Sequence, residues 1–207
     1  MIDKDVVGEF WRARADRGTT RWTGDGMLET DVALASRFVG PGARILDLGS
    51  GFGELSRTIC PPDGEVLAVD AVAGMSAGFE GDERFAFVAH DVLGFRTDRR
   101  FDIVLLFGVV NYLEIDEVER IAQTISEVLV PGGVAIVKNQ CADGEAFEVD
   151  VDFQGSGQRY VAWYPDVATE KHALMAAFPS VEVVPYPPEL KAHDNSTHVA
   201  FICRKPS

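Results

Sequence analysis

The chain has 207 residues, of which 46% are hydrophobic and 25% charged, and its formal net charge at pH 7 is -14. These values predict one domain with a sizeable core, and the acidic balance argues against DNA or RNA as a partner, because proteins that bind nucleic acid usually carry a basic surface. The three cysteines lack C-x-x-C spacing, which argues against a disulfide framework or a zinc site. With no recognisable signal peptide or membrane-spanning stretch, a cytoplasmic protein without a membrane partner is expected.

Two helices are predicted ahead of the first strand. Residues 3–17 carry apolar side chains at positions 6, 7, 10, 11 and 15, which is the spacing of an amphipathic helix. Residues 18–24 are typical of a loop, and a second helix is expected from Leu28 to Phe38. The one locally basic stretch of the sequence lies in this region and is formed by Arg12, Arg14, Arg17 and Arg21.

An apolar run from Ala43 to Leu48 leads into the glycine-rich segment 49–53 and then into a helix that ends near Cys60. This order predicts a buried parallel strand, a tight turn and a helix, which is where doubly wound α/β sheets bind nucleotides. The dinucleotide fingerprint places a glycine at its sixth position, where this chain has Glu54. Asp47 and Glu54 would repel a pyrophosphate, so a ligand with a cationic centre is favoured.

With this segment the sequence resembles the class I S-adenosylmethionine-dependent methyltransferases, whose first motif is an acid-x-Gly-x-Gly-x-Gly turn after the first strand. The resemblance implies that S-adenosylmethionine is the cofactor and that it is bound by Asp47, Gly49, Gly51 and Gly53. It also implies that the helices ahead of the first strand form a lid. In this lid Arg21 and Trp22 would close over the methionine carboxylate, or an acidic acceptor would bind to the arginines.

The later landmarks of the family follow strands that are predicted at 65–69, 84–89 and 101–107. The resemblance implies cofactor contacts at the carboxyl ends of these strands: Asp70 and Ala71 with the ribose, Asp91 and Val92 with the adenine, and Phe107 ahead of the family's fourth motif. That motif, at residues 108–113 with Asn111 and Tyr112, would lie beside the methyl group; it lacks the prolines of the enzymes that methylate amino groups of DNA, which does not exclude other amines. Asp116 and Glu119 predict a capping box for a helix to Leu129. The turn at 131–133 is expected to precede a fifth strand at 134–137, and the resemblance covers residues 43–140.

Beyond the fifth strand the chain is expected to build the acceptor side, with an acidic ribbon that contains Glu148, Asp150 and Asp152, a helix at 166–178, and strands at 181–184 and 197–203. The resemblance implies a single-domain α/β fold, a doubly wound Rossmann-like methyltransferase fold with a mostly parallel seven-stranded sheet and one antiparallel strand near the C-terminus. Residues 1–40 would form the lid, 41–140 the cofactor-binding core and 141–207 the acceptor side.

Methyl transfer to a hydroxyl needs a positioned base, because the hydroxyl proton leaves as the new bond forms. His193, which follows the apolar segment 186–188 and precedes Asp194, is the preferred candidate. Glu145 is the second candidate, and Asn139 is expected to orient the acceptor. A magnesium ion held by Asp143, Glu145 and Asp150 is an alternative way to bind paired hydroxyls.

The leading functional hypothesis is O-methylation of a carbohydrate or a similar small polar metabolite, since aromatic faces with carboxylates and amides suit sugar hydroxyls. The acceptor would then be a sugar or glycan, and the protein a monomer or homodimer. The alternatives are N- or C-methylation of another small molecule, a domain that binds S-adenosylmethionine without catalysis, and a nicotinamide oxidoreductase, which the glycine spacing disfavours.

Overall fold

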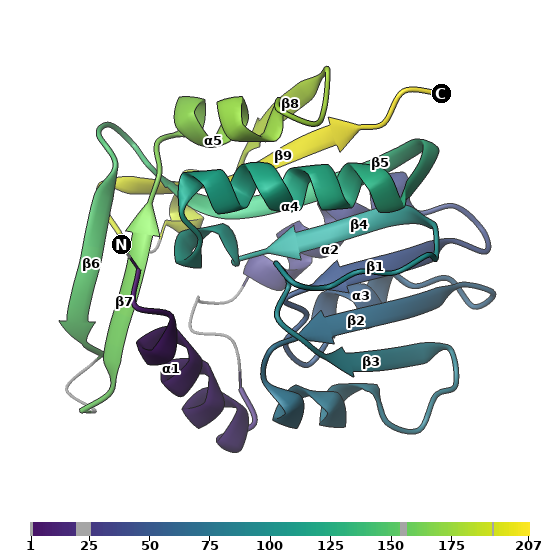
Figure 1. Ribbon diagram of the computed structural model, residues 1–207, viewed down its shortest axis with the longest axis horizontal. Helices are drawn as coiled ribbons and strands as arrows, with labels where there is room; N and C mark the ends of the chain where they lie inside the picture. The colour runs from purple at the N-terminus through teal and green to yellow at the C-terminus, as the bar shows by residue number, and fades with distance from the viewer. Residues whose placement is uncertain (1, 20–25, 154–156, 192) are drawn as a thin grey trace.

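The structure is a computed structural model that describes residues 2–19, 26–153, 157–191 and 193–207. Its centre is a seven-stranded sheet in the order β3-β2-β1-β4-β5-β9-β8, in which β9 runs antiparallel to both of its neighbours. The strands are β1 (Arg44–Leu48), β2 (Glu65–Asp70), β3 (Phe85–Ala89), β4 (Phe101–Phe107), β5 (Leu129–Ala142), β8 (Val181–Pro185) and β9 (Ser196–Arg204). The predicted fold class, with a mostly parallel sheet and one antiparallel strand, is confirmed (Figure 1).

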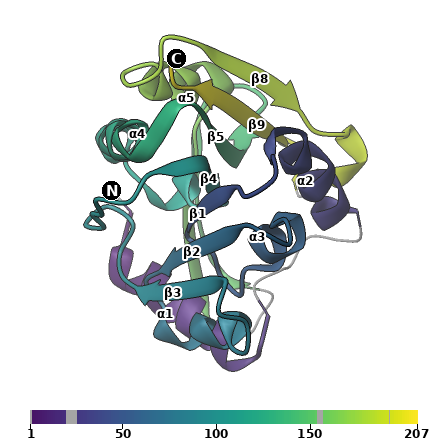
Figure 2. The ribbon, with the colours of Figure 1, turned by 90° about the vertical axis from the view of Figure 1, so that its right-hand side faces the viewer.

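Helices cover both faces of the sheet because its central strands are apolar on both sides. In β1, Ile45 packs in the cluster that contains the α2 and α3 side chains, whereas Leu46 packs in the cluster that contains those of α4 and α5. Figure 2 shows these layers on either side of the sheet. The helices are α2 (Met27–Ala35), α3 (Glu54–Ile59), α4 (Ile115–Val128) and α5 (Val167–Leu174). Short 3-10 turns lie at η1 (Ser36–Phe38), η2 (Ala73–Phe79), η3 (Val110–Tyr112) and η5 (Pro188–Leu190).

The predicted capping box of α4 is correct in kind but wrong in position. The N-cap residue is Glu114 rather than Asp116, and its partner is Glu117 rather than Glu119. The Glu114 backbone N–H donates to Glu117 Oε2 at 2.9 Å, and the Glu114 side chain accepts from the backbone at the third helical position. The helix therefore begins earlier than the sequence indicated. Glu114 and Glu117 have the same capping-box spacing as the predicted pair, and each lies two positions ahead of its predicted counterpart.

The fifth strand is much longer than the predicted segment 134–137. β5 extends to Ala142 because all of β9 pairs with its second part, from Val134 opposite Arg204 to Ala142 opposite Ser196. Residues 138–142, which were expected to leave the sheet, therefore belong to a rigid and buried strand.

A separate two-stranded ribbon stands beyond the carboxyl ends of the parallel strands (Figure 1). It consists of β6 (Phe147–Asp152), the predicted acidic ribbon, and β7 (Arg159–Tyr164), which was not predicted. Helix α1 (Lys4–Asp16) packs on this ribbon through a cluster that joins Phe10 to Tyr160 and Tyr164. The predicted N-terminal helix is thus present and lies opposite the ends of the sheet strands.

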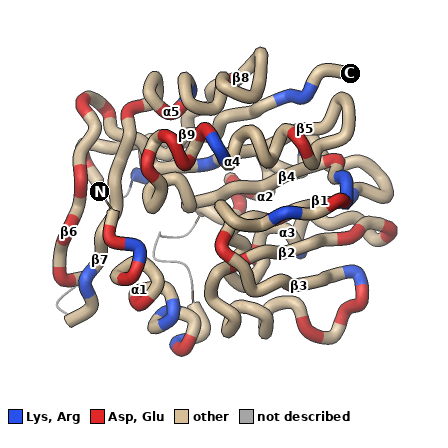
Figure 3. The backbone as a smooth tube through the Cα atoms, in the orientation of Figure 1, with Lys and Arg blue, Asp and Glu red and all other residues tan. Residues whose placement is uncertain are grey.

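Figure 3 shows acidic residues along α1, α4 and β6, with lysines and arginines dispersed among them. In the described part of the chain, no helix has the length and apolar character needed to cross a membrane.

Candidate active site

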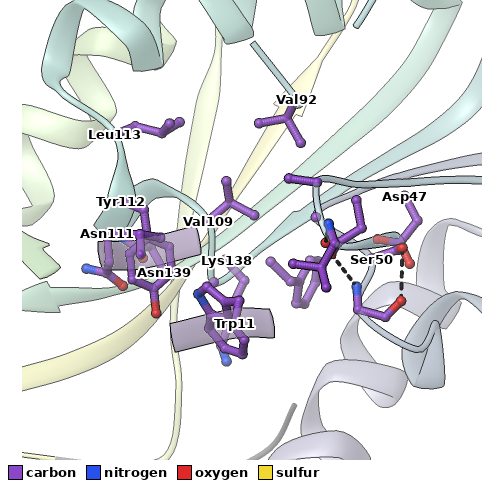
Figure 4. Close-up of a pocket in the computed structure, with 18 of the residues that line it drawn as sticks. Trp11, Asp47, Ser50, Val92, Val109, Asn111, Tyr112, Leu113, Lys138 and Asn139 are labelled. Atoms are coloured by element: carbon purple, nitrogen blue, oxygen red, sulfur yellow. Dashed lines mark hydrogen bonds between the residues drawn. The ribbon is translucent and has the colours of Figure 1, made fainter. Parts of the chain in front are cut away.

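A cavity of about 460 Å³ lies at the carboxyl ends of β1, β2, β4 and β5, and α1 lies across it. Its volume falls within the usual range for sites that bind small molecules. Figure 4 shows Asp47 and Ser50 at one side of the cavity and Asn111 and Tyr112 at the other, with Trp11 between them. The cavity therefore has a glycine-turn end and a second end, which is formed by α1, η3, the later residues of β5 and the first residues of β7 and β9.

The turn after β1 depends on glycine for two reasons. Gly49 and Gly53 both have φ of 71°, in the left-handed region where residues with a Cβ are strained. A Cβ on Gly49 would also lie 2.3 Å from Val109 Cγ2, and one on Gly53 would lie 2.3 Å from the Phe79 ring. The backbone of the turn is thus packed closely against side chains from other elements.

Asp70, at the end of β2, organises the same turn. Its two carboxylate oxygens accept hydrogen bonds from the backbone N–H groups of Gly51 and Val72, each at 2.9 Å. Burial raises the pKa of this carboxyl, while these two hydrogen bonds oppose the rise. Asp70 lines the cavity together with Ala71, so its remaining lone pairs are available to a ligand there.

Asp47 is 5% exposed and carries the most perturbed carboxyl at this end. Burial, together with the neighbouring Asp70, raises its pKa to about 7, although a hydrogen bond with Ser56 opposes the rise. Asp47, Glu54, Asp70 and Asp91 all line the cavity. This end of the cavity therefore suits a cationic ligand with ribose hydroxyls and would repel a phosphate.

The residues that the sequence assigned to the cofactor mostly meet here. The cavity lining includes eight of them: Asp47, Gly49, Gly51, Asp70, Ala71, Asp91, Val92 and Phe107. Gly53 shapes the turn from behind the lining, and Arg21, with Trp22, lies outside the described residues. Asp91 Oδ1 accepts from Leu93 N–H at 2.8 Å, which holds the loop after β3 against the cavity.

Asn111 is the best-oriented polar group at the second end. The side chain is 6% exposed, and its Nδ2 donates to the carbonyls of Gln140 at 3.0 Å and Trp163 at 2.8 Å. Both amide hydrogens are therefore used, and the amide plane is fixed. Within the described chain no donor reaches Oδ1, so this oxygen is available to accept a hydrogen bond from a molecule in the cavity.

The two amides on β5 are committed to the protein itself. Asn139, the expected orienting residue, donates from Nδ2 to Glu170 Oε2 at 2.9 Å on the α5 side of the sheet. Gln140 donates from Nε2 to Ser196 Oγ at 2.6 Å. Although Asn139 borders the cavity, its amide donor points toward a buried carboxyl, so Asn111 is better placed than Asn139 to orient an acceptor.

Neither expected base lines the cavity. His193 is exposed in the loop before β9, where its ring lies 5.9 Å from the Tyr164 ring, and Glu145 is exposed in the loop before β6. The histidine that does line the cavity is His198, on β9. The sequence had placed Asn111 beside the methyl group but had not selected it as a site residue, and it had preferred His193 to His198.

The proposed magnesium ligands are not gathered at one point. Asp143 pairs with Lys191 at 2.5 Å and Asp150 pairs with Arg159 at 2.6 Å. Among the described residues, no group of three or more His, Cys, Asp or Glu side chains is arranged to hold a metal ion.

Comparison with known proteins agrees with this geometry. Residues 45–133 match a family model described as a methyltransferase domain. The 1,6-didemethyltoxoflavin-N1-methyltransferase of Burkholderia thailandensis, solved with S-adenosylhomocysteine, is similar with a TM-score of 0.77 and 22% identity, over 99% of this chain and 89% of that chain. No curated protein sequence matches the chain.

Two further solved structures share the fold. The N-methyltransferase NodS from Bradyrhizobium japonicum WM9 has a TM-score of 0.66 and 17% identity, over 88% of this chain and 99% of that chain. The glycopeptide N-methyltransferase MtfA, solved with S-adenosylmethionine, has a TM-score of 0.63 and 17% identity, over 89% of each chain.

Proposed function

We propose that this class I S-adenosylmethionine-dependent methyltransferase methylates a nitrogen that carries a hydrogen, on a small, flat acceptor that is uncharged at neutral pH. The orientation of the Asn111 amide is the observation that carries the proposal. With both amide hydrogens donated to backbone carbonyls, Oδ1 can accept a hydrogen bond from the acceptor N–H. That contact would direct the nitrogen lone pair, and such alignment is the main contribution that a protein makes to a displacement reaction.

In this proposal the two ends of the cavity divide the work. Asp70 would bind the ribose hydroxyls, Asp91 and Val92 the adenine, and Asp47 with Gly49 the methionine part. S-adenosylmethionine supplies a methyl group on a sulfonium sulfur, and transfer forms a C–N bond while the C–S bond breaks and the N–H proton passes to water. The apolar Val109 and Leu113 line the space between and limit access of water.

A nitrogen acceptor fits the groups around the second end better than a hydroxyl does. An uncharged nitrogen has a lone pair before it loses its proton, whereas a hydroxyl needs a base. The two bases expected from the sequence lie away from the cavity lining. His198 does line it, but burial and the charge of Lys138 lower the pKa of its ring to about 3, so it is a weak base.

The polar lining also argues against a molecule with many hydroxyls. Both amide hydrogens of Asn111, and one each of Asn139 and Gln140, which could otherwise serve a sugar, are donated within the protein. Trp11, Tyr112 and Tyr160 supply aromatic surface, which suits a flat ring. The three solved proteins named above are described as N-methyltransferases, and this supports the same class of acceptor atom.

O-methylation of a carbohydrate or related polyol remains the second candidate function. The same aromatic side chains could stack on a sugar ring, and the charged pairs Lys4–Glu117 and Lys138–Asp31 border the cavity and could bind hydroxyls. In this case a base would have to come from the acceptor side of the chain.

Matched acceptors distinguish the two candidates. The protein is incubated with methyl-labelled S-adenosylmethionine and with one of two matched pairs of acceptors. The flat pair is 7-aminocoumarin and 7-hydroxycoumarin, and the sugar pair is glucosamine and glucose. The proposal predicts label on the amino member of the flat pair. Label confined to the hydroxyl compounds would overturn it and support the second candidate.

A further inference from the structure

The second end of the cavity contains a buried histidine without a partner. His198 pairs with Gln140 in the β5–β9 ladder, lines the cavity and is 6% exposed. Within the described chain neither Nδ1 nor Nε2 of its ring has a hydrogen-bond partner. A buried polar atom left unpaired costs about 1–3 kcal/mol, so a partner that comes from outside the chain would stabilise it.

The ring is uncharged at neutral pH. Burial, and to a smaller extent the neighbouring Lys138 and His193, lower its pKa to about 3. An uncharged imidazole has one N–H donor and one nitrogen acceptor. The two nitrogens point in different directions, so a ligand group in the cavity can meet only one of them, which is a donor or an acceptor according to the tautomer. A ligand group that offers both a donor and an acceptor suits either tautomer.

The surroundings of His198 also favour an uncharged ligand group. Lys138 Nζ lies 3.9 Å from Asp31 Oδ1, and the Tyr186 hydroxyl donates to the same oxygen at 2.8 Å. The two charges balance each other at the edge of the cavity. A charged group placed there would be desolvated without a net opposite charge, and this is costly in a buried site.

We infer that His198 recognises a lactam edge of the acceptor, in which a ring N–H adjoins a carbonyl, at a distance from the nitrogen that is methylated. This inference rests on the proposed function, since it describes the same flat acceptor. Asn111 would then hold the reacting nitrogen, and His198 would fix the orientation of the ring from β9. Neither group takes part in breaking the C–S bond, so His198 is a specificity residue.

Two flat probes test this inference directly. Lumazine, which has lactam edges, and pteridine, which lacks the carbonyls, are titrated into the protein saturated with S-adenosylhomocysteine. Wild-type protein should bind lumazine about 10-fold more tightly than pteridine, which is the effect of one uncharged hydrogen bond. His198→Phe should abolish this difference, His198→Gln should keep most of it, and the exposed His172→Gln is the matched control.

The outcomes separate the inference from the proposed function. The inference is wrong if wild-type protein does not bind lumazine or does not prefer it to pteridine, or if His198→Phe binds lumazine as wild type does. In each of these cases, label on the amino compounds would still support N-methylation. If lumazine binding depends on His198 but only hydroxyl compounds are methylated, the recognition site stands and the proposed function fails. Should His198→Phe not fold, the comparison of His198→Gln with wild type decides, because a purely structural role would not favour lumazine over pteridine.

Discussion

At the scale of single residues, the molecule keeps several carboxyl groups where water cannot reach them. Glu170 is fully buried on α5, and burial raises its pKa to about 7, against hydrogen bonds from Asn139 and Cys141 that lower it. As a carboxylate, Glu170 leaves its Oε1 without a partner, and Asn139 Oδ1 also has none in the described chain. A protonated Glu170 carries an O–H that can satisfy such an acceptor, so the folded protein favours the acid form.

Glu170→Gln should therefore change how stability depends on pH. The pKa of Glu170 is raised in the folded state, so the folded protein binds this proton more tightly than the unfolded chain does. The stability that protonated Glu170 contributes is therefore complete below pH 4.5, the ordinary pKa, and is lost as pH rises toward 7. Glutamine supplies a permanent N–H donor, so the variant should gain stability relative to wild type between pH 5 and pH 8, by on the order of 1–3 kcal/mol.

Denaturant unfolding at several pH values measures this difference. Glu145→Gln, at an exposed position, is the control that removes a carboxylate without burial. If the curves for Glu170→Gln and wild type run parallel from pH 5 to pH 8, Glu170 is not protonated in the fold.

At the scale of elements, the second end of the cavity depends on how α1 is held across it. Phe10 is 3% exposed, and its ring centroid lies 5.2 Å from that of Tyr160 and 5.4 Å from that of Phe153. Lys4 adds contacts at the other end of the helix, donating to the Tyr112 carbonyl and to Glu117. Trp11 thus reaches the cavity because the neighbouring side chains fix the helix to η3, α4 and the ribbon.

Phe10→Ala should release α1 more than it unfolds the rest of the protein. Removing a buried phenylalanine costs roughly 3–5 kcal/mol, and here the loss falls on the contact of one helix with a small ribbon. We expect hydrogen exchange in residues 4–16 to speed up by at least about 10-fold, while exchange in the β1 and β4 amides changes little.

Turnover of the Phe10→Ala variant should fall as exchange in α1 speeds up, because Trp11 would no longer form one wall of the cavity. Val151→Ala, which truncates an exposed side chain on the neighbouring β6, serves as the control. Equal acceleration throughout the sheet would show that α1 is not a separate unit.

At the scale of the whole molecule, the sequence predicted the strands and cavity residues of 41–140, the part expected to bind the cofactor, better than those of 141–207, the expected acceptor side. Continuous apolar runs such as Phe101–Phe107 identify buried parallel strands, and in such sheets the ligand site lies at their carboxyl ends. Most of the residues that the sequence assigned to the cofactor therefore line the cavity, since they lie at or just beyond the carboxyl ends of recognisable strands.

The acceptor half depends on tertiary pairing that local pattern does not contain. β7 is a strand because β6 pairs with it and α1 covers it, and β5 reaches Ala142 because β9 pairs with it. His198 faces the cavity through that pairing, whereas His193 lies only five positions away in a loop and is exposed. Choosing between these two histidines required the strand register, which composition and spacing do not supply.

If the Asn111 carbonyl oxygen orients a nitrogen for methylation, Asn111→Ala should lower kcat/KM for 7-aminocoumarin. We expect a fall of roughly 10- to 100-fold, as for a lost orienting hydrogen bond, with unchanged affinity for S-adenosylhomocysteine and with wild-type kinetics for the exposed control Asn195→Ala. Wild-type kcat/KM in Asn111→Ala would show that the acceptor nitrogen is aligned without this contact, and the role proposed for Asn111 would be wrong.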